Sequence, residues 1–235
     1  AMARVAPQSR LDDLVGAALR VFARQGYERT QMADVARELG VAPGTLYRYV
    51  EGKEALFHLV VDRALRRGPL PPPDVLPVGT PPPGGTERRL RERLAEAMRF
   101  PKLEEALERR RVTDPRGELA GVVRELYART AAMRLGATMV ERSAAERPEL
   151  AKLWFREARQ SFFDRLAAYI ARRVERGHFA PVPDASVAAR IVVETVTWFA
   201  RHRHGDPDVP FDDEIALESV LHFVLSTLTP EEKSR

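Results

Sequence analysis

The chain has 235 residues, with 38 Lys and Arg against 34 Asp and Glu and a formal net charge of +4 at pH 7. It contains no cysteine, which excludes a disulfide framework and a thiol nucleophile. With 44% hydrophobic residues and no apolar run near the roughly 18 residues of a membrane span, we expect a cytoplasmic protein without a membrane partner.

The positive charge is concentrated near the start of the chain. Residues 1–67 hold 11 Lys and Arg against 8 Asp and Glu, so +3 of the net +4 lies there. A local surplus of positive charge favours an anionic partner. If the partner carries phosphates, each phosphate that the protein neutralises releases bound counterions, which favours binding.

Two amphipathic helices are predicted at the start of the chain. Apolar residues recur at helical spacing from Leu11 to Gly26, and a second set runs from Met32 to Gly40. Thr30 is the expected N-cap of the second helix.

A short third helix follows at once. Gly40 favours the end of one helix and Pro43 the start of the next, so residues 31–49 have the length of a helix-turn-helix unit. In that unit the second helix lies in the major groove of DNA. The residues after Pro43 place several hydroxyls and a guanidinium within little more than one helical turn. Such groups can hydrogen-bond to phosphates and to base edges.

The spacing of these residues resembles the N-terminal domain of the tetracycline-repressor (TetR) family. The similar stretch covers roughly residues 10–60. It comprises Leu14-Val15-x-Ala17-Ala18-x-x-Val21-Phe22-x-x-x-Gly26-Tyr27, Asp34-Val35-Ala36 and Gly40-Val41-x-x-Gly44-Thr45-Leu46-Tyr47-x-Tyr49-x-x-x-Lys53-Glu54-x-Leu56. The resemblance implies a homodimeric, ligand-responsive repressor that binds a double-stranded DNA operator.

Roles for the DNA-binding residues follow from this resemblance and from their chemistry. Arg48 is expected to read base edges, because its fork can pair with guanine. The predicted DNA-binding set is Thr30, Gln31, Gly44, Thr45, Tyr47, Arg48, Tyr49 and Lys53. Thr45, Tyr47, Tyr49 and Lys53 are expected mainly to hold phosphates. Backbone N–H groups near Gly44 are expected to help at the start of the helix, and Gln31 to replace the hydroxyl that is common in the family. The chain departs from the family pattern at Gln31, Ala42 and Val50, where a hydroxyl, a Ser and a Phe are common.

A Pro- and Gly-rich segment interrupts the helices. After an apolar stripe over residues 53–67, residues 68–85 contain eight Pro and four Gly and cannot form a regular helix. We expect an extended loop, either an ordered cover or mobile; a polyproline II ligand for a proline-binding module is the alternative.

The rest of the chain reads as helices without strand patterns. The predicted spans are residues 86–100, 103–112, 117–142, 148–176, 184–204 and 211–228. The fold class is therefore all-α, with a helix-turn-helix domain over residues 1–53 and a larger helical domain over residues 54–235 for regulation and dimerisation.

The last two helices have wide apolar faces. Part of each must serve the core of the monomer, and the family resemblance implies that the rest forms a two-fold dimer interface. The predicted interface residues are Ile191, Thr195, Trp198, Phe199, Val220, Phe223 and Val224. A symmetric dimer would present two DNA-binding domains about 34 Å apart, which implies a pseudo-palindromic operator.

Large, adaptable apolar residues supply material for a small-molecule pocket in the larger domain. The predicted lining is Met98, Phe100, Met133, Met139, Trp154, Phe155, Phe162 and Phe163. Each of these residues could equally belong to the ordinary core. The prediction of a pocket depends on the resemblance, because members of the family commonly bind an inducer. There are two alternatives. The larger domain could bind a protein partner in place of the small-molecule effector, or the chain could be an enzyme or carrier on the same helical scaffold.

Catalytic and metal sites have little support. His202 and His204 lie near Asp206 and Asp208, but residues two apart on a helix face different sides, and no third ligand has a suitable spacing. No Gly-rich phosphate loop or nucleophile elbow occurs. We therefore expect no enzyme activity, no cofactor and no metal.

Overall fold

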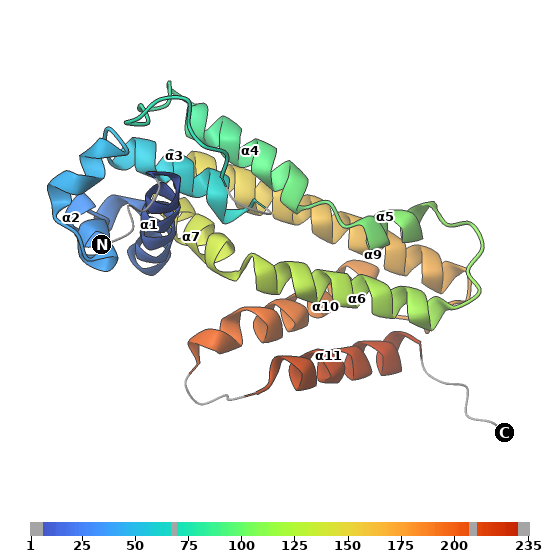
Figure 1. The fold of residues 1–235 in the computed structure, drawn as a ribbon. Helices are drawn as coiled ribbons and strands as arrows, with labels where there is room; N and C mark the ends of the chain where they lie inside the picture. Colours follow the sequence, from blue (N-terminus) through green and yellow to red (C-terminus); the bar gives the residue numbers. More distant parts are fainter. Residues whose placement is uncertain (1–6, 67–69, 207–210, 230–235) are drawn as a thin grey trace. The chain divides into compact units, whose positions relative to one another are not determined.

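The computed structural model describes residues 7–66, 70–206 and 211–229, and helices account for most of them (Figure 1). Within these ranges there is no β-strand, and the single recorded bridge joins Val50 to Val78. The predicted all-α class is confirmed. None of the described helices is long and apolar enough to cross a membrane.

The chain divides into two compact units. Residues 1–97 and 135–158 form the first, here called the head unit, and residues 98–134 and 159–235 form the second, here called the bundle unit. These bounds differ from the predicted domains, residues 1–53 and 54–235. The difference arises because helices beyond residue 53 pack in the same unit as the helix-turn-helix.

The head unit contains the helix-turn-helix and the helices that support it. Its helices are α1 (Pro7–Arg29), α2 (Met32–Leu39), the 3₁₀ helix η1 (Pro43–Arg48), α3 (Lys53–Ala64), α4 (Gly85–Ala97), α7 (Arg134–Ala144), α8 (Pro148–Ala151) and nearly all of the π-helical stretch η2 (Lys152–Arg159). The apolar stripe predicted for α1 is confirmed, since Leu14, Val21 and Phe22 have no exposed surface. The ring of Phe22 packs edge-on against that of Phe57 on α3, with centroids 5.1 Å apart.

Two glycines end the first helices as predicted. At Gly26 the backbone leaves the helical conformation with φ of +80°, which bends α1 before its last residues. Gly40 ends α2 in the left-handed conformation with φ of +74°, and its N–H donates to Arg37 at 3.2 Å. A residue with a Cβ adopts these angles only at a cost, so glycine specifies both turns.

The bundle unit consists of longer helices with clear starts. They are α5 (Pro101–Glu108), α6 (Pro115–Ala132), α9 (Gln160–Glu175), α10 (Ala185–Ala200), the 3₁₀ helix η3 (His202–Gly205) and α11 (Asp213–Leu228). Three begin at an aspartate whose carboxylate accepts backbone N–H groups of the first turn, namely Asp114, Asp184 and Asp212. Such caps satisfy donors that the helix itself leaves unpaired.

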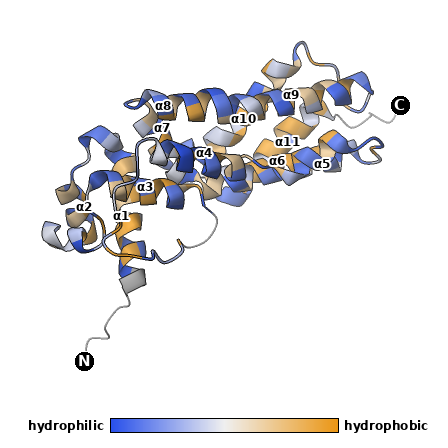
Figure 2. Ribbon diagram, turned by 90° about the horizontal axis from the view of Figure 1, so that it is seen from above, coloured by the Kyte–Doolittle hydropathy of each residue, from blue (hydrophilic) through white to orange (hydrophobic). Residues whose placement is uncertain are grey.

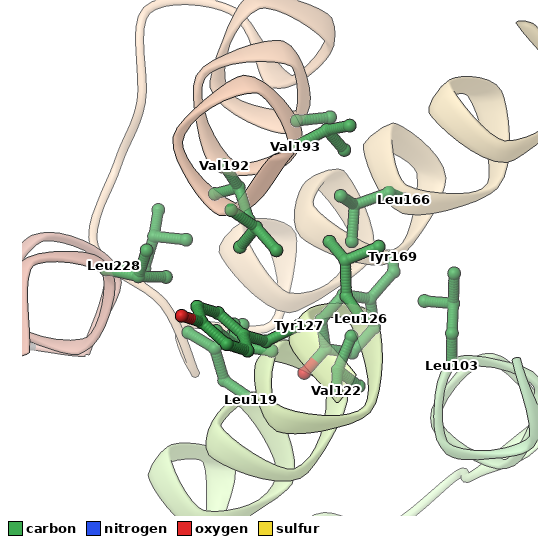
Figure 3. Close-up of a cluster of buried hydrophobic side chains, with 14 of the residues drawn as sticks. Leu103, Leu119, Val122, Leu126, Tyr127, Leu166, Tyr169, Val192, Val193 and Leu228 are labelled. Atoms are coloured by element: carbon green, nitrogen blue, oxygen red, sulfur yellow. The ribbon is translucent and has the colours of Figure 1, made fainter. Parts of the chain in front are cut away.

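The core of the bundle unit draws on all of its α-helices. Figure 3 shows Leu126 and Tyr127 of α6 close to Leu166 and Tyr169 of α9 and to the valines of α10. Each large apolar side chain buried in this way contributes on the order of 1.5–3 kcal/mol to folding.

A buried ion pair crosses this core. Arg173 on α9 has no exposed surface, and its Nε lies 2.8 Å from Glu118 of α6, while its Nη2 donates to the carbonyl of Ala106. The hydroxyl of Tyr169 donates to the same carboxylate at 3.2 Å. Burial and the neighbouring Glu118 raise the pKa of Tyr169, so the phenol stays protonated.

Three predicted helices are each divided in the structure, and one of them, the span 184–204, is separated at Arg201 into α10 and η3. The span 117–142 is two helices, because Met133 leaves the helical conformation between α6 and α7. The span 148–176 begins as α8, widens into a π-helical stretch η2 (Lys152–Arg159) and continues as α9. The other predicted ends lie at most four residues from the observed ones, and Arg67, Gly68 and Pro69 lie outside the described residues.

Candidate nucleic-acid interface

The predicted recognition helix is η1, a short 3₁₀ helix. Ala42 precedes it without a side-chain cap, and Pro43 occupies its first turn. Leu46 has no exposed surface and anchors η1 to the rest of the head unit. The helix therefore has one buried side, and its other residues are turned outward.

The outward side of η1 carries the groups expected to meet DNA. Gly44 and Arg48 are exposed, and half of the Tyr47 surface is exposed. Thr45 and Tyr49 are partly exposed. A guanidinium and a phenol that are both exposed on this short turn can donate hydrogen bonds to base edges and to phosphates.

The structure corrects one detail at the start of α2. Thr30 is not the N-cap: its side chain is buried, and its hydroxyl donates to the carbonyl of Gly26 at 2.6 Å. The N-cap is Gln31, whose N–H donates to the carboxylate of Asp34 at 3.0 Å. This bond is the main reason that the pKa of Asp34 is lowered. Gln31 itself is exposed, whereas Thr30 is turned into the protein.

Lys53 has partners within the head unit. Its ammonium donates to the carbonyls of Tyr27 at 3.1 Å and Glu28 at 3.2 Å, and it lies 4.3 Å from the centre of the Tyr27 ring. The cation thus stabilises the C-terminal end of α1, where helix carbonyls are unpaired. An ammonium has three donors, so these two bonds leave one for a phosphate.

Arg147, which precedes α8, lies over the aromatic cluster of the head. Its guanidinium carbon is 4.7 Å from the centre of the Tyr27 ring and 5.6 Å from that of Phe57. Its nitrogens reach Glu54 at 3.5 Å and Glu87 at 3.3 Å. The Tyr27 hydroxyl also donates to Glu54, and burial together with this bond raises the tyrosine pKa. Arg147 therefore joins α1, α3 and α4.

The end of α7 holds the bend in α1 directly. Glu146 accepts the N–H of Glu28 at 2.9 Å, and a Cβ added to Gly26 would come within 2.7 Å of the same carboxylate. Arg142 donates to the carbonyl of Arg24. The roles of Arg142, Glu146 and Arg147 were not predicted, because nothing in the local sequence pattern links residues 142–147 to α1.

The predicted pocket residues are divided between the two units. Met139, Trp154 and Phe155 belong to the head unit, where the first two are buried and Phe155 is 42% exposed. Members in the bundle unit are Met98, Phe100, Met133, Phe162 and Phe163. Phe100 and Phe162 pack against each other with ring centroids 4.4 Å apart, and Phe163 belongs to the same core.

The predicted dimer face is partly exposed on α10 and α11, the latter strongly hydrophobic in Figure 2. Ile191 is 61% exposed and Phe223 is 71% exposed, whereas Val220 and Val224 are buried. An apolar groove of about 500 Å³ runs between the two helices, with Thr195 among its lining residues. Trp198 is exposed, and Phe199 is partly buried against the core.

The described ranges hold no cluster of metal-ligating side chains. His204 lies within 3.5 Å of Asp213, and burial together with Arg134 and Arg203 lowers its pKa. Asp208, considered with the two histidines at the sequence level, lies outside the described residues.

Two family models match the chain. The model described as bacterial regulatory proteins of the tetR family matches residues 14–60, which contain α2, η1 and most of α1 and α3. The model described as the C-terminal domain of AefR-like transcriptional repressors matches residues 118–216.

A named relative is similar to part of the chain. DrrR1, an HTH-type transcriptional repressor from Streptomyces coeruleorubidus, is 43% identical over 60 residues, which are 26% of this chain and 22% of that protein. The match thus spans about a fifth of this relative.

Solved structures extend the likeness to the whole chain. The ketosteroid transcriptional regulator KstR2 of Mycobacterium tuberculosis has a TM-score of 0.60 at 19% identity, covering 97% of this chain and 100% of that one. The regulator PfmR from Thermus thermophilus has a TM-score of 0.55 at 22% identity, covering 95% and 97%. This shared fold and the two family models show that the chain belongs to the TetR family of transcriptional regulators.

Proposed function

We propose that the protein is a homodimeric repressor that binds a pseudo-palindromic operator and is released from it by a small, mostly apolar ligand. The observation that carries the DNA-binding part is the exposed set on η1. Tyr47 and Arg48 are turned outward while Leu46 is fully buried, so these side chains are held on a fixed turn and free of the core. Arg48 reads a base edge, and Thr45, Tyr47 and Tyr49 hold phosphates.

Selection of bound sequences from a random DNA pool tests this assignment. The selected sites should contain two half-sites one helical turn apart, or a multiple of it. Arg48→Ala should relax the preference at one or two base positions, because a bidentate contact contributes about 1–3 kcal/mol of discrimination. Selection of no preferred sequence by the wild type would exclude the assignment.

Lys53 allows a finer test, because it has protein partners as well as a proposed phosphate. If Lys53 neutralises a phosphate, Lys53→Ala should weaken binding to all sequences and lower the salt slope by about one unit. If it only stabilises the end of α1, affinity should fall with an unchanged slope. Titrations at several salt concentrations separate the two roles.

Dimerisation is proposed through α10 and α11. Isolated exposed apolar residues are ordinary, but Ile191 and Phe223 flank one continuous apolar groove. A second copy related by a two-fold axis would cover the same groove on both molecules. Ile191→Glu with Phe223→Glu should yield monomers in sedimentation velocity. Val75→Glu, which changes an equally exposed apolar residue elsewhere, is the control and should leave the dimer intact.

The effector is proposed from the chemistry of the predicted pocket residues, which are aromatic or thioether side chains. A ligand can lower operator affinity only by as much as it prefers the conformer that binds DNA poorly. Mass spectrometry of the purified, denatured protein tests for a bound apolar molecule. Adding any molecule so identified should release the selected operator, and failure of every identified molecule to do so would favour a protein partner as the regulating signal.

A further inference from the structure

The Pro- and Gly-rich segment folds back on the residues that follow the recognition helix. We call residues 77–80 the strap. The N–H of Val78 donates to the carbonyl of Tyr49 at 2.8 Å, and the N–H of Glu51 donates to the carbonyl of Val78 at 3.0 Å. These two bonds form the parallel bridge between Val50 and Val78.

A third bond fastens the strap at its far end. The N–H of Thr80 donates to the Glu51 carboxylate at 2.8 Å, and Gly79 lies against the same side chain. The strap thus contacts residues 49–51 from outside through three hydrogen bonds.

Residues 49–51 connect η1 directly to α3. Tyr49 and Val50 both donate their N–H to Leu46 of η1, and Val50 has no exposed surface. The Tyr49 carbonyl and the Glu51 N–H find their recorded backbone partners in the strap. The exit of η1 is therefore completed by a segment that lies well over twenty residues further along the chain.

The composition of the strap region favours an ordered connection. The strap begins at Pro77 and is followed by Pro81, and these prolines restrict the unfolded chain, so less conformational entropy is lost when the strap pairs. Thr80 precedes Pro81, which already biases it toward an extended backbone. The conformational entropy lost on ordering the strap is therefore smaller than for a flexible loop of equal length.

We propose that Val78, Thr80 and Glu51 are positioning residues for DNA recognition: the strap fixes the direction in which η1 presents Tyr47 and Arg48. This inference rests on the proposed function, because it requires η1 to read DNA. Base readout demands a fixed geometry of the reading side chains, whereas attraction to phosphates tolerates variation. Loss of the strap contact should therefore reduce specific binding more than non-specific binding.

Thr80→Pro tests the inference without changing any residue of η1 or of residues 49–51. Proline removes the N–H that donates to the Glu51 carboxylate, and a residue before proline is in general biased toward the extended backbone that proline also adopts. Thr80→Ala keeps the N–H and is the matched control. We expect Thr80→Pro to bind the selected operator about 3–10-fold more weakly than Thr80→Ala, as for the loss of one exposed hydrogen bond to a charged group, with equal affinity for random DNA.

Glu51 supplies a second, charge-matched pair. Glu51→Gln and Glu51→Ala remove the same negative charge, but only Gln keeps an oxygen that can accept the Thr80 N–H. Glu51→Ala should bind the operator more weakly than Glu51→Gln, and adding Thr80→Pro to Glu51→Ala should cost nothing further. If Glu51 touched DNA instead of the strap, Thr80→Pro would have no effect and the inference would be overturned.

Amide hydrogen exchange follows the strap without DNA. The Glu51 and Val78 amides should exchange slowly in the wild type and faster in Thr80→Pro, while those of α1 stay unchanged. Equal operator affinity for Thr80→Pro and Thr80→Ala would refute the strap inference and leave the proposed function intact. A wild type that selects no DNA sequence would refute both, even with slow exchange at Glu51.

Discussion

Replacement of Arg147 should lower the stability of the head unit, because this one side chain contacts two aromatic rings and two carboxylates. Arg147→Met keeps most of the length of the side chain and its apolar stem but removes the guanidinium. Arg147→Lys keeps the charge but loses the planar fork, so it can neither stack on a ring with its whole face nor reach Glu54 and Glu87 together. The pair of variants separates charge from geometry.

The magnitude follows from the contacts. Two cation–π contacts of a partly buried guanidinium contribute about 0.5–1 kcal/mol each. The two ion pairs are long, at 3.3 and 3.5 Å, and the side chain is 23% exposed, so together they add on the order of 1 kcal/mol. We expect Arg147→Met to cost about 2 kcal/mol and Arg147→Lys to cost about 1 kcal/mol. For a chain of this length a loss of about 2 kcal/mol lowers Tm by roughly 4–8 °C.

Urea unfolding followed by tryptophan fluorescence measures these costs. The chain has two tryptophans, so a Trp198→Phe background leaves Trp154, which belongs to the head unit, as the single reporter. The reasoning is refuted if Arg147→Met unfolds within about 0.5 kcal/mol of its background, a threshold set by ordinary surface substitutions. It is also refuted if Arg147→Lys costs as much as Arg147→Met, since the retained charge would then contribute nothing.

Three further predictions concern other contacts. Gly136→Ala should destabilise by about 1–3 kcal/mol in thermal unfolding, because its Cβ would overlap a carbonyl of α3, whereas Gly121→Ala, with only the flexible end of a lysine nearby, should be neutral or stabilising. Arg173→Met should cost about 3–5 kcal/mol in denaturant unfolding, since Glu118 would stay buried without its partner. Burial and a nearby guanidinium lower the pKa of His58, so the unfolded chain binds its proton more readily and stability falls below about pH 6.5; in stability–pH curves His58→Gln should flatten that fall.

The helix-turn-helix was predictable because its signals are local. Gly26, Gly40 and Pro43 act through their own backbone preferences, and the structure has its bends and starts at these residues. The apolar stripe of α1 is also a local pattern, since a period of about 3.6 residues places the stripe on one face. The existence and the type of these elements could therefore be predicted from the sequence.

The features that the sequence did not predict have different physical causes. Met133 interrupts a pattern that is helical on both sides, so neither propensity nor periodicity marks the break. Val78 sits in a segment whose composition excludes a helix but does not reveal a partner at residues 49–51. Thr30 is a good N-cap by type, yet its hydroxyl finds the Gly26 carbonyl, and the cap moves to Gln31. Of these three features, only the pairing of Val78 is a contact between residues distant in the sequence, whereas the bonds of Thr30 and Gln31 span four and three residues.

The order of the two units along the chain has a consequence for biosynthesis. The head unit is assembled from residues 1–97 and 135–158, so its first and last parts are separated by a stretch of the bundle unit. The N–H of Glu28 donates to Glu146, which is synthesised 118 residues later. At about 5–20 residues per second, the ribosome exposes the helix-turn-helix for several seconds before that carboxylate exists. A nascent chain released early would hold an incompletely supported reading surface, and neither unit can be exchanged between relatives as one uninterrupted gene segment.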